Sequence, residues 1–414
     1  MRKNLFELSP SLYKGFFLNR ILKRSRDQSP YYKTFKNFNS IPVINKKIFL
    51  DNFVDLNSFA LSYDECLSKG LAQENSRIFK PEPEGYSIGL SSGTSGKRGV
   101  FLTTEDEQLK WAANLLSHLS WFSFLSKYRI GFILRANSPM YEKVSRSKRI
   151  NFKFFDLMIP LDKLLLDFSQ YNPTIIVAPS YILEEILKYK TSNPSLFLEV
   201  KIIVSVADVL SDELKNRLKE AFICPIHQIY QATEGFLATT CIYENLHLNE
   251  DLLLFEKEYV DVNTKRFTPI ITDYFRETQS FIRYRLDDIL ILNPDPCACG
   301  SKKDQLLRIE GRSDEVLTFD GIKVFPDYLR NAIQNALNES LDFCINKKDE
   351  AIVVKLAGQF NQDIQQKIIQ NISQLLSQLK IKDIKCTVEF EFQRDFSQKR
   401  RRVYDLDKNK PQKV

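Results

Sequence analysis

The segment Tyr86-Ser-Ile-Gly-Leu-Ser-Ser-Gly-Thr-Ser-Gly-Lys-Arg-Gly99 decides how the rest of this chain is interpreted. A short apolar run leads into it, glycines and hydroxyl residues fill positions 91–96, and Lys97 and Arg98 close it. Glycines allow backbone N–H groups to turn inward around an anion, hydroxyl groups add donors, and cations balance negative charge. The segment therefore predicts a phosphate-binding loop, although the same composition could also form a flexible polar turn.

Two well-known glycine motifs do not fit this loop. A Walker A loop needs four residues between its glycines and a Ser or Thr after its Lys. Here two residues separate Gly93 from Gly96, and Arg98 follows Lys97. The serine-hydrolase elbow needs a second glycine at the position that Lys97 occupies. Any phosphate binding by this loop therefore follows a different scheme.

Around the loop, apolar runs alternate with helical stretches. The apolar runs cover residues 129–134, 174–179 and 201–207, and helical patterns cover residues 181–189 and 211–222. Strands and helices that alternate at this spacing indicate a parallel sheet with helices packed on its faces.

The chain after Gln231 has a different pattern. Short apolar runs with tight connections predict a smaller antiparallel or barrel-like sheet. Beyond Gly311, two helices and two strands predict a compact α+β unit, at residues 327–337, 362–379, 351–356 and 386–392. We therefore predict an α/β protein with a large N-terminal domain at residues 1–310 and a small C-terminal domain at residues 311–414.

Composition excludes several classes of protein. The chain has 414 residues, of which 43% are hydrophobic and 27% are charged, with a formal net charge of +7. These totals fit a globular protein with a substantial core. Seven cysteines, an odd number, argue against a disulfide framework. No apolar run approaches the ~20 residues of a membrane helix, and no signal peptide is recognisable, so we expect a cytoplasmic protein without membrane insertion.

The first 32 residues form a basic amphipathic pattern. Such a pattern could suit a membrane surface, but a helix that caps the fold is the commoner explanation, and we favour it. Ser29-Pro30 predicts a break between two helices.

Four ordered motifs resemble those of the adenylate-forming superfamily, which includes acyl-CoA synthetases, nonribosomal adenylation domains and luciferases. The loop Ser91–Gly99 resembles its phosphate loop, and Tyr230-Gln-Ala-Thr-Glu-Gly235 its aromatic-x-x-Thr-Glu signature. Arg283-Tyr-Arg-Leu-Asp-Asp288 and Gly311-Arg-Ser-Asp-Glu315 resemble its Tyr-Arg-x-x-Asp segment and its hinge. The resemblance implies that the large domain is an adenylate-forming domain with mixed or parallel sheets, helices and a small β subdomain, and that the small α+β domain is mobile.

Further segments are similar to the phenylacetate–coenzyme A ligase-like branch, which also holds the synthetase that adenylylates a deazaflavin coenzyme. They are Ser29-Pro-Tyr-Tyr32, Leu246-His-Leu-Asn-Glu-Asp251, Cys297-Ala-Cys-Gly300 and Gly321-Ile-Lys-Val-Phe-Pro326. With the short length of the chain, they extend the resemblance over essentially the whole sequence.

The resemblance implies how ATP and Mg²⁺ would be bound. It assigns Tyr230 to the nucleotide site, the α-phosphate to Thr233 and Mg²⁺ to Glu234, and it makes the last two catalytic. It assigns the β- and γ-phosphates to the loop residues Ser91, Ser92, Gly93, Thr94, Ser95, Gly96 and Lys97.

The resemblance also implies a ribose site and a hinge. Asp288 would bind both ribose hydroxyls, since one carboxylate can accept two hydroxyl hydrogens. Arg312 would assist it, and the small domain would turn about Asp314. In isolation, Glu234 or Asp288 would be interpreted as an ordinary loop or strand-end carboxylate.

The superfamily carries a catalytic lysine near its C-terminus, and Gln398-Lys-Arg-Arg-Arg-Val403 stands where it is expected. The resemblance makes Lys399 the candidate, because a positive charge stabilises the negative charge that builds up when a carboxylate attacks a phosphate. The family usually has glycine before this lysine, whereas this chain has Gln398. A solvated basic run or a nucleic-acid patch is the alternative.

Three cysteines and a histidine predict a structural zinc site. His247 follows Cys241 by six positions, and Cys297-Ala-Cys299 comes about fifty positions later. Zinc accepts such a four-ligand set in closed sites, and related enzymes of the same branch place metal-binding residues here. The alternative is four reduced side chains without a metal.

The function that the resemblance implies is ATP-dependent activation of a small carboxylic acid, possibly aromatic, to an acyl-adenylate with release of pyrophosphate. The acyl group would then pass to a thiol, of CoA or of a carrier protein. An adenylyltransferase or amide-forming ligase with another acceptor is the alternative within enzymes. A non-enzymatic basic nucleic-acid-binding protein is a further alternative, but aromatic residues interleaved with basic ones are absent outside the tail. We therefore expect no nucleic-acid partner.

Overall fold

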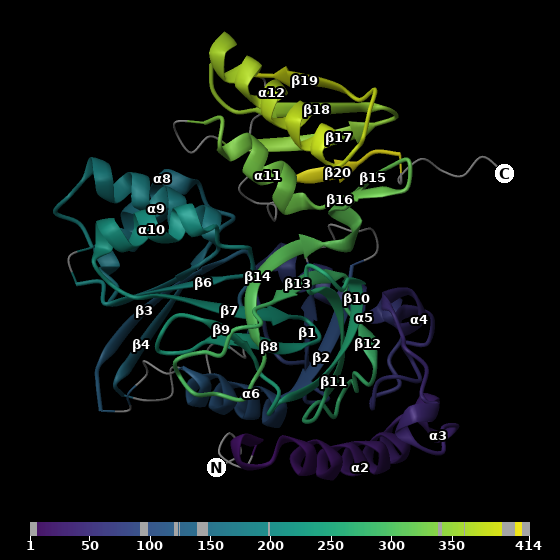
Figure 1. Cartoon of the computed structure of the whole chain (residues 1–414). Coiled ribbons are helices and arrows are strands. Elements are labelled where there is room, and N and C mark those ends of the chain that lie inside the picture. Colours follow the sequence, from purple (N-terminus) through teal and green to yellow (C-terminus); the bar gives the residue numbers. More distant parts are fainter. Residues whose placement is uncertain are drawn as a thin grey trace. The chain divides into compact units, whose positions relative to one another are not determined.

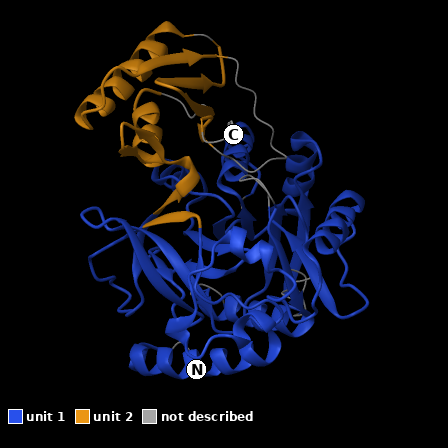
Figure 2. Cartoon of the chain, turned by 90° about the vertical axis from the view of Figure 1, so that its right-hand side faces the viewer, with its two compact units in different colours: residues 1–286, 291–308 blue, residues 287–290, 309–414 orange. Residues whose placement is uncertain are grey.

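The computed structural model describes residues 6–91, 98–119, 123, 125–138, 148–197, 199–337, 342–359, 361–390 and 402–407. Internal contacts divide the chain into two compact units (Figure 2). Unit 1 comprises Met1–Leu286 and Ile291–Arg308, and unit 2 comprises Asp287–Leu290 and Ile309–Val414. The sequence predicted one boundary, after residue 310. The internal contacts also group residues 287–290 with the small unit.

The parallel half of unit 1 agrees with the predicted alternation of strands and helices. Neighbouring strands pair in parallel in the order β4-β3-β5-β6-β7. These strands are β3 (Tyr128–Leu134), β4 (Ile150–Asp156), β5 (Ile175–Ala178), β6 (Ile202–Val206) and β7 (Ile226–Ala232). Their connections carry α8 (Leu161–Tyr171), α9 (Ser180–Ser192) and α10 (Asp212–Phe222), which lie together beside this part of the sheet (Figure 1).

Glycine at position 131 sets how closely α8 approaches the sheet. A Cβ there would lie 2.4 Å from the Phe168 ring of α8. Alternate residues of the same strands, including Ile130 and Val177, form an apolar cluster of their own. Both faces of these strands are therefore apolar, as expected for parallel sheet.

The antiparallel strands after β7 continue the same sheet, whereas the sequence predicted a separate, smaller one. A tight turn at Thr233-Glu234 reverses the chain, so that β8 pairs with β7 and the sheet extends across this hairpin. The added strands are β8 (Gly235–Thr240), β9 (Leu246–Leu248), β10 (Leu253–Asp261), β11 (Arg266–Asp273), β12 (Tyr284–Arg285), β13 (Asp288–Leu292) and β14 (Gln305–Arg312).

Unit 1 also contains a β-hairpin and several helices. Strands β1 (Tyr86–Leu90) and β2 (Val100–Thr104) pair antiparallel on either side of the glycine-rich loop. The helices are α2 (Pro10–Gln28), α3 (Pro30–Lys33), α4 (Lys46–Asp51), α5 (Tyr63–Ser76) and α6 (Glu105–His118), with a 3₁₀ turn η1 (Phe38–Ser40). Ser29 is extended, as a residue before proline favours, and it breaks α2 from α3 as predicted.

Unit 2 is an α+β unit around its own core. Its sheet has the order β19-β18-β17-β20. Ile345, Val354 and Ile372 are among the fully buried core residues. The elements are η3 (Ser313–Glu315), β15 (Leu317–Phe319), β16 (Ile322–Val324), α11 (Pro326–Gln334), β17 (Phe343–Lys348), β18 (Ala351–Leu356), α12 (Gln362–Gln378), β19 (Lys385–Glu389) and β20 (Val403–Asp405).

Within the described residues, none of the helices combines the length and the apolar composition that crossing a membrane requires.

Candidate functional site

The predicted phosphate loop connects β1 to β2, and its base is closed by short hydrogen bonds. The Gly99 N–H donates to Ser91 Oγ at 2.6 Å, and the Ser91 N–H donates to the Gly99 carbonyl oxygen at 2.8 Å. The base therefore continues the β1–β2 ladder by one more pair. The other loop residues of the prediction lie outside the described residues: Ser92, Gly93, Thr94, Ser95, Gly96 and Lys97.

Arg98 holds the base of the loop from the side. Its Nε donates to the Ser91 carbonyl oxygen at 2.6 Å. Its two terminal nitrogens each donate to the Glu74 carboxylate on α5, both at 2.7 Å. This paired geometry is the strong form of an arginine–carboxylate contact. The charge of Arg98 is therefore balanced by Glu74, and its contribution here is to brace the loop.

The turn at Thr233 and Glu234 lies beside the loop base. It joins β7 to β8, whose last pair is Ala232 with Gly235. A Cβ placed on Gly99 would be 4.0 Å from Thr233 Oγ1. Thr233 Oγ1 donates to the Glu234 carboxylate at 2.7 Å. Two motifs more than 130 positions apart in the sequence thus meet, with hydroxyl and carboxylate groups at the meeting point.

Tyr230 stands near the C-terminal end of β7, before this turn, and its side chain is buried. Ligands in open parallel sheets commonly bind outside the carboxyl ends of strands. The Tyr230–Glu234 segment occupies such an end.

The predicted ribose and hinge residues gather in unit 2. Arg312 donates from one terminal nitrogen to Asp287 at 3.0 Å and from Nε to Asp314 at 3.2 Å. Burial alone would lower the pKa of Arg312, but the charges of Asp288, Asp314 and Asp287 outweigh burial and raise it. Arg312 thus binds two carboxylates, Asp287 and Asp314, and the charge of a third, Asp288, lies nearby. Gly311 precedes it with φ +146°, and a Cβ there would lie 2.8 Å from the Glu315 carboxylate.

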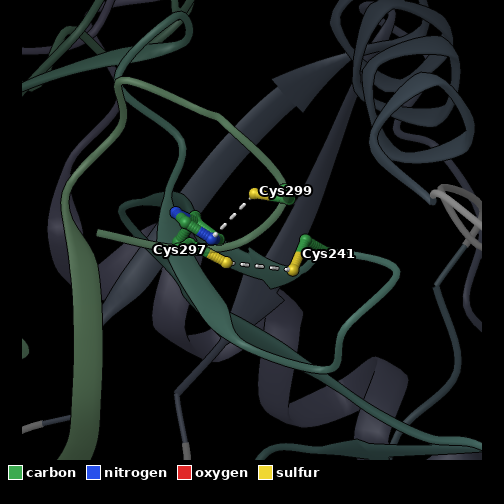
Figure 3. Close-up of side chains that lie close together, drawn as sticks. Cys241, Cys297 and Cys299 are labelled. Atoms are coloured by element: carbon green, nitrogen blue, oxygen red, sulfur yellow. Dashed lines mark hydrogen bonds between the residues drawn. The ribbon is translucent and has the colours of Figure 1, made fainter. Parts of the chain in front are cut away.

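The four predicted metal ligands of unit 1 come together (Figure 3). Cys241 follows β8 and His247 lies in β9, and β9 also pairs with β14, which brings in the loop of Cys297 and Cys299. Their candidate ligand atoms all lie within 4.8 Å of one another. Cys241 Sγ is 3.8 Å from Cys297 Sγ, and Cys299 Sγ is 3.5 Å from His247 Nε2.

These separations fit a tetrahedral metal ion. Around zinc, with Zn–S of about 2.3 Å and Zn–N of about 2.0 Å, ligand atoms lie about 3.5–3.8 Å apart. The His247 ring presents Nε2 to the cysteines, while its Nδ1 is 3.2 Å from the Lys303 carbonyl oxygen. A second contact of this kind orients a metal-binding imidazole.

The environment of Cys297 favours its thiolate form, whereas burial raises the pKa of the neighbouring Cys299 to about 11. Burial alone would raise the pKa of Cys297, but hydrogen bonds from the Cys299 backbone and from the Asn245 amide hold it below its usual value. The Asn245 amide nitrogen lies 3.3 Å from Cys297 Sγ. A thiol with a lowered pKa more readily supplies the thiolate that a metal binds.

Lys399 lies outside the described residues. Four residues that the sequence did not single out contribute to these sites: Glu74 beside the loop, Asp287 beside Arg312, and Asn245 and Lys303 around the cysteines. Asp287 lies inside the Arg283–Asp288 motif, and Lys303 follows Gly300 by three positions, so the motifs could have drawn attention to both. Glu74 gave no signal, because an acidic residue on a helix is common.

Comparisons with known proteins agree with this arrangement. The AMP-binding enzyme family matches residues 69–254, which include the loop and the Thr233–Glu234 turn. Protein CapK of Staphylococcus aureus is 23% identical over 339 residues, covering 76% of this chain and 69% of that protein. Phenylacetate-coenzyme A ligase of Thermus thermophilus is 25% identical over 181 residues, covering 40% of each.

The fold is similar to that of 2-hydroxyisobutyryl-CoA ligase in the postadenylation state in complex with R3-HIB-AMP. The TM-score is 0.67 at 15% sequence identity, and the match covers 94% of this chain and 88% of that one. The mixed α/β fold, the ordered motifs and the matching family agree. The chain therefore carries an AMP-binding enzyme domain over residues 69–254 and is similar in sequence to a phenylacetate-coenzyme A ligase.

Proposed function

We propose that this enzyme activates a small carboxylic acid with ATP and then transfers the acyl group to a thiol. In the first step a carboxylate oxygen attacks the α-phosphorus of ATP, the bond to the β-phosphate breaks, and pyrophosphate leaves. In the second step a thiolate attacks the acyl carbonyl, and AMP leaves with the bonding electrons. Both reactions concentrate negative charge, which positioned donors and cations stabilise.

The observation that carries this proposal is the meeting of the loop base with the Thr233–Glu234 turn. We assign the β- and γ-phosphates to the loop, with Lys97 as its cation, because Arg98 is already paired with Glu74. Thr233 then donates to the α-phosphate. Glu234 supplies an oxygen ligand of the kind Mg²⁺ prefers. When bound, Mg²⁺ would neutralise phosphate charge as pyrophosphate leaves.

For the nucleotide sugar we propose Asp288, held by Arg312. We propose that the small domain rotates about Asp314 between the two steps. We propose Lys399 as the cation that serves the first step. The hydrogen bond from Arg312 to Asp314 and the charge coupling of Arg312 to Asp288 support a shared function of these residues.

Acid-dependent exchange of labelled pyrophosphate into ATP, measured across a panel of acids with Mg²⁺, tests the first step. We expect exchange with at least one small acid, and its loss in Glu234→Ala and in Asp288→Ala. Glu213→Ala is the control, because Glu213 pairs with Arg217 on α10 and is half exposed at 52%. A folded enzyme that binds no ATP with Mg²⁺ would contradict the proposal.

The acceptor needs a separate measurement. With the acid and ATP fixed, CoA, a carrier protein and simple amines are supplied in turn, and the product is weighed by mass spectrometry. We expect a thioester. An amide product would retain the adenylation step but replace the thiol with an amine as the acceptor. An acyl-adenylate that is never transferred would also retain the adenylation step, and would indicate an adenylyltransferase.

We also propose that Cys241, His247, Cys297 and Cys299 bind a structural zinc ion. Four protein ligands leave no open position, so the metal would hold strands together without entering the chemistry. Elemental analysis of the purified enzyme should give about one zinc per chain, falling to near zero in Cys297→Ser. Cys386→Ser in unit 2 should keep the zinc. A metal-free wild type that melts at the same temperature with and without added zinc would refute the site.

A further inference from the structure

The N-terminal helix α2 has apolar side chains on two sides. Tyr13, Phe17 and Ile21 are buried against unit 1, as expected of a helix that caps the fold. On another side, Leu12 is 76% exposed and Phe16 is 64% exposed. Leu8, which precedes the helix and its non-helical N-cap residue Ser9, is 77% exposed. Large apolar residues exposed in a row on an outer helix need an explanation, whereas single ones do not.

The exposed side of α2 changes character along its length. With 100° per residue, Leu12, Phe16 and Lys23 fall within about 40° of one another on the helix circumference, and the buried face is centred about 140° away. Arg20 follows Phe16 by one turn, and both Arg20 and Lys23 are exposed. The exposed side is therefore apolar in its N-terminal half and basic in its C-terminal half.

Some basic residues of α2 form ion pairs with other parts of unit 1, and others are exposed to solvent. Lys14 binds Glu250 at 3.0 Å, and Arg24 binds Glu277 at 3.3 Å, so these two cations stabilise the seat of the helix. The exposed cations are Arg20 and Lys23 on the helix and, past its end, Lys33 and Lys36. Asp27 is an exposed acid among them. The excess charge of this outer surface is thus positive.

We propose that the exposed side of α2 binds the surface of an anionic phospholipid bilayer. A helix that lies in the membrane interface needs apolar side chains that enter the acyl boundary and cations that meet anionic headgroups, and α2 presents both. The helix lies at an outer edge of unit 1, next to the N-terminus (Figure 1). The enzyme would bind at the surface without spanning the bilayer.

Charge argues against a second copy of the chain as the occupant. In an antiparallel contact centred on the middle of the helix, the apolar half of one copy would face the basic half of the other, and in a parallel contact the basic halves would face each other. An antiparallel contact centred on Leu12 and Phe16 would cover the apolar side chains but would leave the basic halves of both copies in solvent. An anionic bilayer satisfies both halves.

Co-sedimentation with vesicles tests the proposal. The full chain is mixed with vesicles of phosphatidylcholine alone or of phosphatidylcholine with phosphatidylglycerol. We expect pelleting with the anionic vesicles only, weakening as salt rises. Leu12→Glu with Phe16→Glu should reduce the apparent affinity at least about tenfold. Arg20→Glu with Lys23→Glu should also reduce it at least about tenfold, since each cation near the surface contributes about fivefold.

Ile223→Glu is the matched control, because Ile223 is 90% exposed at the end of α10, away from α2 (Figure 1). It should bind vesicles as the wild type does, and all variants should melt as the wild type does. Absence of pelleting with anionic vesicles, or full binding by both double variants, would overturn the proposal. The proposal would also be overturned if the wild type does not bind vesicles and light scattering shows a dimer that the Leu12→Glu, Phe16→Glu variant no longer forms.

Discussion

At the scale of single residues, Arg98 and Glu74 hold the base of the glycine-rich loop. Their ion pair joins the end of the loop to α5, and both side chains are mostly buried, at 19% and 14% exposure. A partly buried arginine that loses its carboxylate keeps its desolvation cost without its partner. If the loop binds phosphate as proposed, the pair would influence ATP binding through the position of Ser91 and Gly99.

Replacing Glu74 with Gln should weaken both the fold and the nucleotide site. We expect the free energy of unfolding to fall by about 1–2 kcal/mol, and the Kd for ATP, measured by calorimetry, to rise severalfold. Glu65→Gln on the same helix is the control, since its i,i+4 pair with Lys69 is largely exposed and contributes less than about 0.5 kcal/mol. Equal changes in stability and in the Kd for ATP in the two variants would show that the Arg98–Glu74 ion pair has no specific effect on the loop.

His227 should make stability depend on pH. It is buried beside Thr240, with its Nδ1 2.9 Å from the hydroxyl oxygen, and burial lowers its pKa to about 4. The unfolded chain, with a pKa of about 6.5, therefore binds a proton that the folded protein does not accept. The free energy of unfolding should then fall as pH drops from about 6.5 to 4, by up to about 3 kcal/mol.

Urea unfolding at a series of pH values, with His227→Gln beside the wild type, measures this slope. The variant should lose the His227 part of the slope and should parallel the wild type above neutral pH. Identical slopes in both proteins between pH 4 and 6.5 would show that the histidine does not titrate as described.

At the scale of elements, the cysteine cluster joins β8, β9 and the loop before β14. These strands are short, with β9 covering three residues. A bound metal would replace contacts that such a short strand cannot supply. Chelation, or Cys297→Ser, should lower the melting temperature by several degrees, as followed by circular dichroism, while Cys386→Ser should change it little. An unchanged melting temperature after complete removal of the metal would contradict a stapling function.

Helix α8 packs closely on β3 only because position 131 has no side chain. In Gly131→Ala, the added methyl group must displace Phe168, which should reduce the free energy of unfolding by about 1–3 kcal/mol. In Gly15→Ala on α2, the methyl group meets nothing within 4 Å, and we expect a gain of about 0.5–1 kcal/mol. Denaturant unfolding of both variants checks the pair, and a Gly131→Ala protein as stable as the wild type would show that α8 shifts freely.

For the whole molecule, the separation of the two half-reactions is the central question. If Lys399 serves adenylation, Lys399→Ala should reduce pyrophosphate exchange by at least about 100-fold, yet it should still form thioester from acyl-adenylate supplied in solution. Arg401→Ala in the same basic run is the control. Intact exchange with impaired transfer would assign the lysine to the second step.

The sequence could predict β3, β5 and β6 with α9 and α10, because these strands are continuous apolar runs separated by helical patterns. It missed β4, whose sequence mixes polar and apolar residues, and it missed α8 and β7. It could not predict that the antiparallel strands join the same sheet, since that depends on pairing between β7 and β8 across a two-residue turn. Strands β17 and β20 were missed: β17 ends in polar residues, Asn346-Lys-Lys348, and β20 is three residues long. At the site, motif residues were predictable, whereas Glu74 depended on a tertiary contact that leaves no local pattern.

The path of the chain between the two compact units has a practical consequence. Because residues 287–290 belong to unit 2 while residues 291–308 return to unit 1, the polypeptide passes from one unit to the other three times. No single cut can yield two intact halves, and a fragment starting at residue 311 would leave behind Asp287 and Asp288, the carboxylates that surround Arg312. Expression of either half alone should therefore give a poorly folded product, and gene fusions or split-protein designs on this scaffold would need three breakpoints, one at each passage.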